Sequence, residues 1–256
     1  MHTKLKVDNP YGHNRYGFAW HYVPQGVAAH LDFGCGDGQF TAALRSKGIS
    51  RNVGVDVSSE AIEKGRQQFP ELEFIHISGS LPLPFADGEF SSVTMLDVIE
   101  HVDQQTAVLS ELNRLLHDDG MLIVTVPGRH IFSFLDVGNL KFRFPRLHRW
   151  YYCKIHSEAE YKHRYLSNPD GLVGDISVCK RWHQHFSRKE LAILLERCGY
   201  VVEEFDGAGL FARLLKCIGF LCGSIKVLQR CVNKLERLDA KAFESANLFC
   251  VARKRA

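Results

Sequence analysis

The residues best suited to bind a ligand lie in a glycine-rich segment near the start of the chain. Residues 32–38 read Asp-Phe-Gly-Cys-Gly-Asp-Gly and follow an apolar run. Glycines let a backbone turn tightly and approach a ligand where a Cβ would collide. Asp56 ends the next apolar run, where a carboxylate can accept both hydroxyls of an adenosine ribose. The loop and Asp56 predict a site for an adenosine compound, and the additional acid Asp32 favours one with an amino-acid end.

A second group of reactive side chains follows the strand predicted at residues 91–96. Asp97, Glu100 and His101 are spaced i, i+3 and i+4, so they would share one face if the chain turns helical there. Two carboxylates and an imidazole on one face could bind a divalent cation that orients substrate oxygens and lowers the pKa of one. Alternatively, the histidine acts as a lone base or as a hydrogen-bonded wall of a pocket. Both interpretations stay open.

The elements that would position these residues alternate between short apolar runs and amphipathic stretches. This pattern, over residues 28–127, is typical of βα units and a parallel sheet. Strands are predicted at residues 28–33, 52–56, 73–77, 91–96 and 121–126, and helices at 39–47, 59–68 and 104–116. A further helix over 187–198 would begin with a capping box of Ser187 and Glu190. Strands at 200–205 and 247–252 would complete an α/β domain with a seven-stranded, mostly parallel sheet and helices on both faces.

Segments outside this alternation are predicted to be additions to the sheet. Residues 1–27 would form an N-terminal cap, and residues 128–186, rich in aromatic residues, Arg and His, would form a lid or substrate insertion. In residues 208–243, Leu, Ile and Val recur every three or four positions with Lys and Arg between them. This spacing predicts a long amphipathic helix or helix pair, which would pack on its own sheet, on a second subunit or at a membrane interface.

Composition and charge narrow the class of protein. Of the 256 residues, 45% are apolar and 24% are charged, as in ordinary globular domains. We expect a cytoplasmic protein because no apolar signal segment opens the sequence and no apolar run reaches the roughly 20 residues of a membrane span. The eight cysteines form no CxxC pair. The net charge is +3, yet residues 141–164 and 208–243 each carry seven Lys or Arg against two acids, which suits an anionic substrate or a membrane surface.

Residues 31–38 resemble motif I of the class I S-adenosylmethionine-dependent methyltransferases, of the type 11 and type 23 kind. Further matches to this family follow in order at residues 83–90, 97–102 and 115–127. The resemblance covers residues 28–127 and, more loosely, 182–205. It implies a Rossmann-like class I methyltransferase fold and S-adenosylmethionine as the cofactor.

The resemblance implies a role for each matching residue of the cofactor site. Asp32 and the backbone of Gly34 to Gly38 would hold the methionine part, Asp56 the ribose, and Val57 would lie near the adenine. The residues predicted to contact the cofactor are Asp32, Gly34, Cys35, Gly36, Gly38, Asp56, Val57, Gly79, Ser80 and Asp97. Gly79 departs from the family, because many relatives have an adenine-binding Asp there. Backbone groups of residues 79–81 or the Ser80 hydroxyl would substitute.

The pattern of Asp97, Glu100 and His101 also resembles the metal-binding pattern of ubiquinone-pathway O-methyltransferases and small-RNA 2′-O-methyltransferases. A segment of those RNA enzymes similar to residues 182–187 supplies another histidine ligand, which makes His185 or His183 a candidate. The predicted catalytic residues are therefore Asp97, Glu100, His101 and His185. The same four would hold a divalent cation such as Mg²⁺, or else His101 or His185 would act as a metal-free base.

The sequence thus predicts a methyltransferase that modifies a hydroxyl on a glycan, a lipid-linked or another small-molecule acceptor beneath residues 128–186. Side chains that could stack on a ring or meet anionic groups are Trp150, Tyr151, Tyr152, Trp182, Lys141, Arg143, Arg146 and Arg149. Residues 208–243 could place the enzyme at the inner face of the membrane or form a homodimer. Two alternatives stay open, an RNA 2′-O-methyltransferase-like enzyme with metal assistance and a non-catalytic cofactor-binding scaffold. Nucleic acid is the less expected partner because no RNA-binding module is recognisable.

Overall fold

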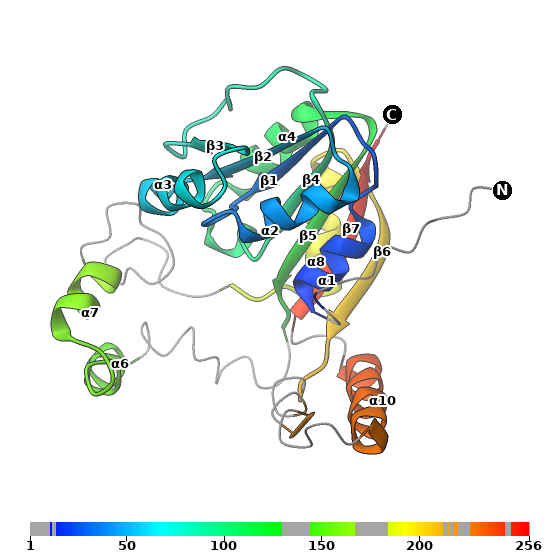
Figure 1. Ribbon diagram of the computed structural model, residues 1–256. Coiled ribbons are helices and arrows are strands. Elements are labelled where there is room, and N and C mark those ends of the chain that lie inside the picture. Colours follow the sequence, from blue (N-terminus) through cyan, green and yellow to red (C-terminus); the bar gives the residue numbers. More distant parts are fainter. Residues whose placement is uncertain are drawn as a thin grey trace.

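A seven-stranded sheet, in the order β3-β2-β1-β4-β5-β7-β6, forms the centre of the molecule (Figure 1). The computed structural model describes residues 11, 14–129, 144–166, 184–211, 215, 218–219, 226–243 and 247–255. The strands are β1 (Ala29–Phe33), β2 (Arg51–Asp56), β3 (Glu73–His76), β4 (Phe90–Leu96), β5 (Leu116–Pro127), β6 (Tyr200–Ala208) and β7 (Asn247–Lys254). The first five run parallel, and β7 is antiparallel to both β5 and β6. The predicted Rossmann-like, mostly parallel sheet is confirmed.

Helices connect the strands close to the predicted positions. The described helices are α1 (Arg15–Tyr22), α2 (Gln39–Ala43), α3 (Ser59–Gln68), α4 (Gln105–Leu115), α6 (Pro145–Tyr152), α7 (Glu158–Tyr165), α8 (Arg188–Arg197) and α10 (Lys226–Phe243). Short 3-10 helices occupy Leu44–Lys47 and Ile99–His101. The predicted capping box is present, because Ser187 accepts from the backbone of Glu190 and the Glu190 side chain accepts in return.

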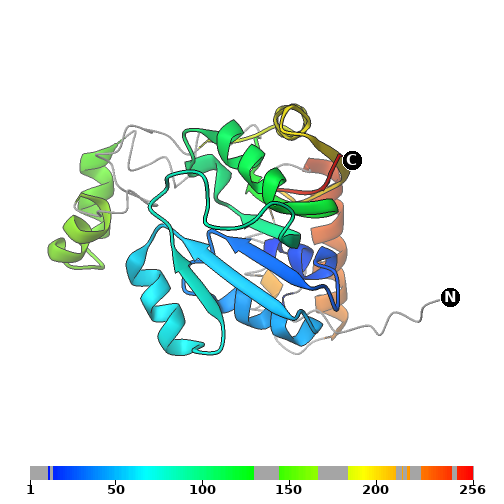
Figure 2. The ribbon, with the colours of Figure 1, turned by 90° about the horizontal axis from the view of Figure 1, so that it is seen from above.

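The two faces of the sheet bury different helices because side chains alternate along each strand. On β5, Leu122 and Val124 belong to one buried cluster, together with Leu112 of α4 and Leu191 of α8. Ile123, between them, belongs to a second cluster that contains residues of α1 and α2. Figure 2 shows this layering, with α4 and α8 on one side of the sheet and α1 and α2 on the other. Both layers leave the ends of β1, β2 and β4 free to form a site.

Helix α1 was predicted only as part of a cap, and its position is fixed at both ends. The Asn14 side chain accepts a 3.0 Å hydrogen bond from the backbone of Gly17 at the start of the helix. At its end, the buried ammonium of Lys47 donates to the carbonyls of Trp20 and Val23. Burial lowers the pKa of Lys47 to about 8. These contacts hold α1 beside the glycine loop, so Arg15 in its first turn is held there too.

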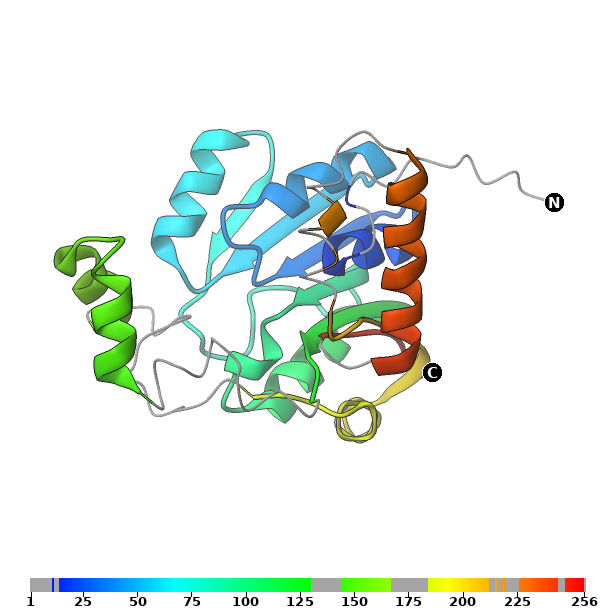
Figure 3. The ribbon, with the colours of Figure 1, turned by 90° about the horizontal axis from the view of Figure 1, so that it is seen from below.

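The insertion predicted at residues 128–186 contains α6 and α7, which pack against each other (Figure 3). Their inner faces meet through His148, Tyr152, Tyr161 and Tyr165, with ring centroids 4.9 to 6.1 Å apart. Four predicted side chains of this insertion lie outside the described residues: Lys141, Arg143, Trp182 and His183.

The second insertion contains the amphipathic helix α10, which the residue spacing predicted. Val232 and Asp239 are buried, and Asp239 accepts a 2.8 Å hydrogen bond from the backbone of Phe211, so the helix is tied to the turn after β6. Its exposed large apolar residues are Val227, Leu228, Leu235 and Leu238. None of the helices in the described ranges combines the length and apolar character needed to cross a membrane.

Candidate functional site

The candidate site lies where the parallel strands β1, β2 and β4 end, at the carboxyl edge of the sheet. A cavity of about 840 Å³ opens there, lined by Asp56, Val57, Leu96, His101 and other residues. A smaller cavity of about 350 Å³ adjoins it, because Gly34, Gly36 and Leu96 line both. Ligands bind at this edge in open α/β sheets because the strand order reverses there, between β1 and β4.

The glycine loop separates the two cavities, and its backbone is left-handed at Gly34, Gly36 and Gly38, with φ of 81°, 55° and 78°. A Cβ at Gly34 would collide with Val98, and one at Gly38 would collide with Phe74, so these glycines allow close packing. A Cβ at Gly36 would meet no protein atom within 4 Å. The open side of Gly36 therefore adjoins the space that a ligand could occupy.

Asp56, the last residue of β2, is joined directly to this loop. Its Oδ2 accepts a 2.7 Å hydrogen bond from the backbone of Gly36, and its Oδ1 accepts a 2.9 Å bond from the backbone of Ser58. A carboxylate has about four acceptor positions, so two remain for a ligand. Val57 and Ser58 line the cavity beside it. The arrangement fits the predicted role of Asp56 as an acceptor for ribose hydroxyls, which stays a prediction.

Asp32 lines the smaller cavity and is the outer end of a buried chain of polar side chains beneath it. It accepts hydrogen bonds from the hydroxyls of Thr41 and Thr94 at 2.7 and 2.8 Å. Since Thr94 donates to Asp32, the 3.0 Å contact between Thr94 and His30 requires His30 Nε2 to donate. Burial raises the pKa of Asp32 to about 6, against the effect of the two threonines, and lowers the pKa of His30 to about 3.

Helix α1 adds Arg15 to the site, a residue that the sequence did not single out. Arg15 lines the smaller cavity together with Asp32, Tyr11 and Tyr16. Its guanidinium forms an ion pair with Asp97 and donates to the Tyr16 hydroxyl at 3.0 Å. Burial acts to lower the pKa of Arg15, but Asp97 and Tyr16 raise it above its usual value. The only signal in the sequence was that Arg15 lies among aromatic residues, and many arginines with a purely structural role have the same surroundings.

Asp97, Glu100 and His101 are not brought together as the spacing predicted. Asp97 has a left-handed backbone, with φ of 54°, and the helical turn begins only at Ile99, so no regular helix aligns the three side chains. Asp97 is turned to Arg15 and to Thr125, whose hydroxyl donates at 2.6 Å. In the part of the chain that the structure describes, no three His, Cys, Asp or Glu side chains form a metal-binding group. The predicted divalent cation is therefore not supported.

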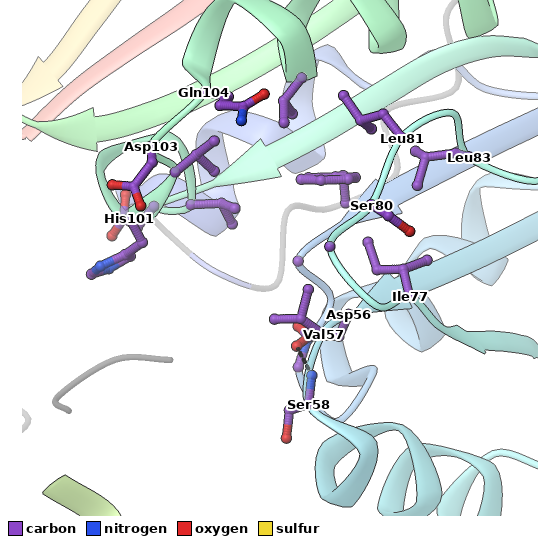
Figure 4. A pocket seen from close by; sticks show the side chains of 18 of the residues that line it. Asp56, Val57, Ser58, Ile77, Ser80, Leu81, Leu83, His101, Asp103 and Gln104 are labelled. Carbon is purple, nitrogen blue, oxygen red and sulfur yellow. Dashed lines mark hydrogen bonds between the residues drawn. The ribbon is translucent and has the colours of Figure 1, made fainter. Parts of the chain in front are cut away.

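Asp97 and His101 both line the larger cavity, and because Asp97 is paired with Arg15, His101 is the one placed to meet a substrate. Its Nε2 lies 3.9 Å from Oε1 of Glu100, whose side chain is fully buried. Glu100 does not line the cavity, so it can act only through His101. Figure 4 shows His101 and Asp103 on one side of the cavity and Ser80 and Leu81 on the other. The sequence did not indicate Asp103.

The far side of the cavity contains the predicted adenine region. Gly79, Ser80 and Leu81 all line it, beside the apolar side chains of Ile77 and Leu83. The Ser80 hydroxyl already forms a 2.7 Å hydrogen bond with Ser78. Backbone groups of residues 79–81 are thus the simpler substitute for the missing acid.

His185 is described, but it lines neither cavity. Its carbonyl accepts a 3.3 Å hydrogen bond from Arg129, and the following residue, Phe186, pairs with Gly128 beyond the end of β5. His185 thus does not line the site, and its predicted catalytic and metal-binding roles stay predictions.

Comparison with known proteins identifies relatives of this fold and site. A family model described as a methyltransferase domain matches residues 18–204. A probable S-adenosylmethionine-dependent methyltransferase of Mycolicibacterium smegmatis is 32% identical over 126 residues, which cover 46% of this chain and 48% of that protein. A demethylmenaquinone methyltransferase of Staphylococcus saprophyticus is 34% identical over 98 residues, 36% of this chain and 42% of that protein. The chain thus spans about half the length of the curated relatives it matches.

Solved structures share the fold over nearly the whole chain. An S-adenosylmethionine-dependent methyltransferase of Mesorhizobium loti has a TM-score of 0.57 at 13% identity, and the match covers 94% of this chain and 99% of that one. A methyltransferase of Methanosarcina mazei has a TM-score of 0.55 at 20% identity, covering 92% and 96%. At these identities the likeness shows the fold alone.

Proposed function

The chain belongs to the class I S-adenosylmethionine-dependent methyltransferases, and we propose that it transfers a methyl group from that cofactor to a hydroxyl on a glycan, a lipid-linked or another small-molecule acceptor. The observation that carries the proposal is the arrangement of Asp56, the open side of Gly36 and His101 around one cavity. When bound, S-adenosylmethionine supplies a methyl group on a sulfonium that needs only an aligned nucleophile.

The residues around the two cavities fit the parts of this cofactor. Asp56 offers acceptors for ribose hydroxyls, and Ile77, Leu83 and the backbone of residues 79–81 offer an apolar, hydrogen-bonding surface for adenine. The smaller cavity offers charges of both signs, since Asp32 suits an ammonium and Arg15 suits a carboxylate. A ligand with an adenosine and an amino-acid end would use both cavities.

His101 would act as the base that removes the acceptor's proton. A hydroxyl is a weak nucleophile until it is deprotonated, and an imidazole within hydrogen-bond reach can do this near neutral pH. Once protonated, the imidazolium would be stabilised by the buried carboxylate of Glu100, 3.9 Å away. Glu100 would therefore be a positioning residue for His101.

The acceptor class is proposed from the surroundings of the site. The described parts of the insertion supply aromatic side chains for a ring and Arg146 and Arg149 for anionic groups. Helix α10 presents exposed Val227, Leu228, Leu235 and Leu238 with Lys and Arg between them. This suits peripheral contact with a membrane, which would bring the enzyme to a lipid-linked acceptor, or contact with a second copy of the chain.

A transfer experiment tests the proposal. Purified protein is incubated with S-adenosylmethionine labelled in its methyl group and with separate lipid, glycan and RNA fractions. Label should enter the lipid or glycan fraction as an ether, and His101→Gln should slow the transfer by about 10² or more. Demethylmenaquinone, the acceptor in the name of one relative, is tested in parallel. Label only in RNA would overturn the acceptor class proposed here, label only in demethylmenaquinone and not as an ether would overturn the hydroxyl, and label in no fraction would favour a scaffold.

A further inference from the structure

We propose that helices α6 and α7 form a docking surface for an anionic lipid membrane, separate from α10. The exposed side chains that form it are Phe144, Leu147, Tyr151 and Ile155, each at least half exposed. They recur at three- and four-residue spacing, so they lie along one stripe of α6 and the turn that follows it. Trp150, at 58% exposure, borders the stripe.

This outer stripe has no part in holding the two helices together. The inner face of α6 uses His148 and Tyr152, which pack against Tyr161 and Tyr165 of α7. Tyr161 is only 1% exposed. The helix pair thus has an aromatic core of its own, so the stripe is not required for its folding. Large apolar side chains in that position need another partner, because exposed apolar patches of this kind mark interaction sites.

The charges around the stripe favour an anionic partner. Residues 144–166 contain five Lys or Arg and two acids. Both acids belong to α7 and interact with α6. Glu158 forms an ion pair with Arg149, and Glu160 accepts a hydrogen bond from the Tyr152 hydroxyl. The Nζ of Lys154 lies 4.3 Å from the centroid of the Trp150 ring. Among the described residues, no carboxylate forms an ion pair with Lys154 or Arg146.

The combination of these side chains fits a membrane interface better than a protein groove or a nucleic acid. Trp and Tyr prefer the headgroup level, where an apolar ring is buried and its polar end stays wet. Lys and Arg stems can lie along the apolar region while their charges reach anionic headgroups. A nucleic-acid surface would offer no apolar partner for Leu147 or Ile155.

The helix pair lies beside α3, next to the proposed site, so a membrane contact there would bear on that site. His163 of α7 lies 3.8 Å from Glu60 of α3, and Ser58, which lines the larger cavity, caps the start of α3. Figure 1 shows α6 and α7 on one flank and α10 on the other, both on the side where β5 and β6 end. A membrane at the stripe would therefore lie near the mouth of the proposed site.

Vesicle sedimentation tests the proposal. The full chain should bind vesicles of phosphatidylglycerol and phosphatidylcholine, and bind pure phosphatidylcholine less. Tyr151→Ser with Ile155→Ser should weaken binding about tenfold or more, because two interfacial side chains are lost. Ile193→Ser with Val201→Ser removes two exposed apolar residues from α8 and β6 and should leave binding unchanged. Tryptophan emission should shift to the blue on vesicle addition, and Trp150→Phe should remove that shift.

Other results would overturn the proposal. The wild-type protein could fail to bind anionic vesicles, or the variant with Tyr151→Ser and Ile155→Ser could bind them as well as the wild type does. The stripe could instead bind RNA in preference to vesicles, or the variant could differ from the wild type only by losing a dimer. Binding of S-adenosylhomocysteine does not depend on the stripe. A protein that fails to bind vesicles but still binds S-adenosylhomocysteine would therefore contradict the docking proposal and leave the methyltransferase proposal standing.

Discussion

The carboxylate of Asp56 accepts a hydrogen bond from the backbone of Gly36 across 2.7 Å, so the end of β2 and the glycine loop are joined directly. Twenty residues separate the two in sequence. The bond fixes the open side of Gly36 relative to the carboxylate that would hold a ribose.

Gly36→Ala should weaken binding of S-adenosylhomocysteine at least tenfold, because the new methyl group would occupy space beside the ligand. Gly26→Ala is the matched control. Gly26 also has a left-handed backbone, with φ of 66°, and open space around it, but it lines neither cavity. Both variants should lose about 1 kcal/mol of stability through backbone strain. Equal cofactor affinities in the two variants, measured by calorimetric titration, would contradict the placement of the ligand.

Cofactor affinity should fall below about pH 6 because of Asp32. Burial raises the pKa of Asp32 to about 6, so the free protein holds it protonated below that pH. A ligand ammonium needs the carboxylate ionised, so affinity should be constant above pH 6 and fall by up to about tenfold per pH unit below it. Titrations at pH 5 and pH 7.5 measure this, with 5′-methylthioadenosine, which lacks the amino-acid end, as the control. A parallel fall for both ligands would exclude this role of Asp32.

Arg15→Gln should weaken binding of S-adenosylhomocysteine about tenfold, since a charge-assisted hydrogen bond to its carboxylate would be lost. The affinity for 5′-methylthioadenosine should stay the same, because that ligand has no carboxylate. If both affinities drop together, Arg15 supports the fold of the loop rather than binding the ligand.

His101→Gln should lower kcat by about 10² or more while cofactor affinity stays within twofold, as expected for the loss of a general base. Glu100→Gln should produce a smaller loss in kcat, because its carboxylate acts through His101. A strong chelator should leave wild-type activity unchanged. Activity that vanishes with the chelator and returns with Mg²⁺ would restore the metal hypothesis.

Asp239→Ala should loosen α10 without unfolding the sheet. The buried carboxylate accepts from the backbone of Phe211, and losing it leaves that donor unsatisfied at a cost of about 1–3 kcal/mol. Hydrogen exchange in residues 226–243 should become faster while β5 stays protected. Glu236→Ala, an acid one turn earlier on the same helix, should leave exchange unchanged. Faster exchange in β5 would show that α10 and the sheet unfold together.

The sheet and the glycine loop were predictable because local patterns specify them. Apolar runs predicted all seven strands to within about three residues at each end, except that β5 begins five residues before its predicted start, and the Ser187 and Glu190 capping box marked the start of α8. The loop glycines and Asp56 stand at fixed offsets from these strands. Such features depend on residues that are close to each other in sequence, so a single sequence is enough to recognise them.

The rest of the site depends on contacts between distant segments. Arg15 meets Asp97 across 82 residues, and the helix that carries Arg15 is stabilised by Lys47 and by packing rather than by a regular apolar pattern. The spacing of Asp97, Glu100 and His101 predicted one face, but the left-handed backbone at Asp97 turned its side chain toward Arg15. A sequence pattern cannot reveal a turn that tertiary contacts impose.

Calorimetric titration of the wild-type protein with S-adenosylhomocysteine tests the central claim most directly. We expect saturable binding of one ligand per chain, at least tenfold weaker in Asp56→Asn because a charged acceptor for the ribose is lost. No binding, or tighter binding of NAD in the same cavity, would contradict it.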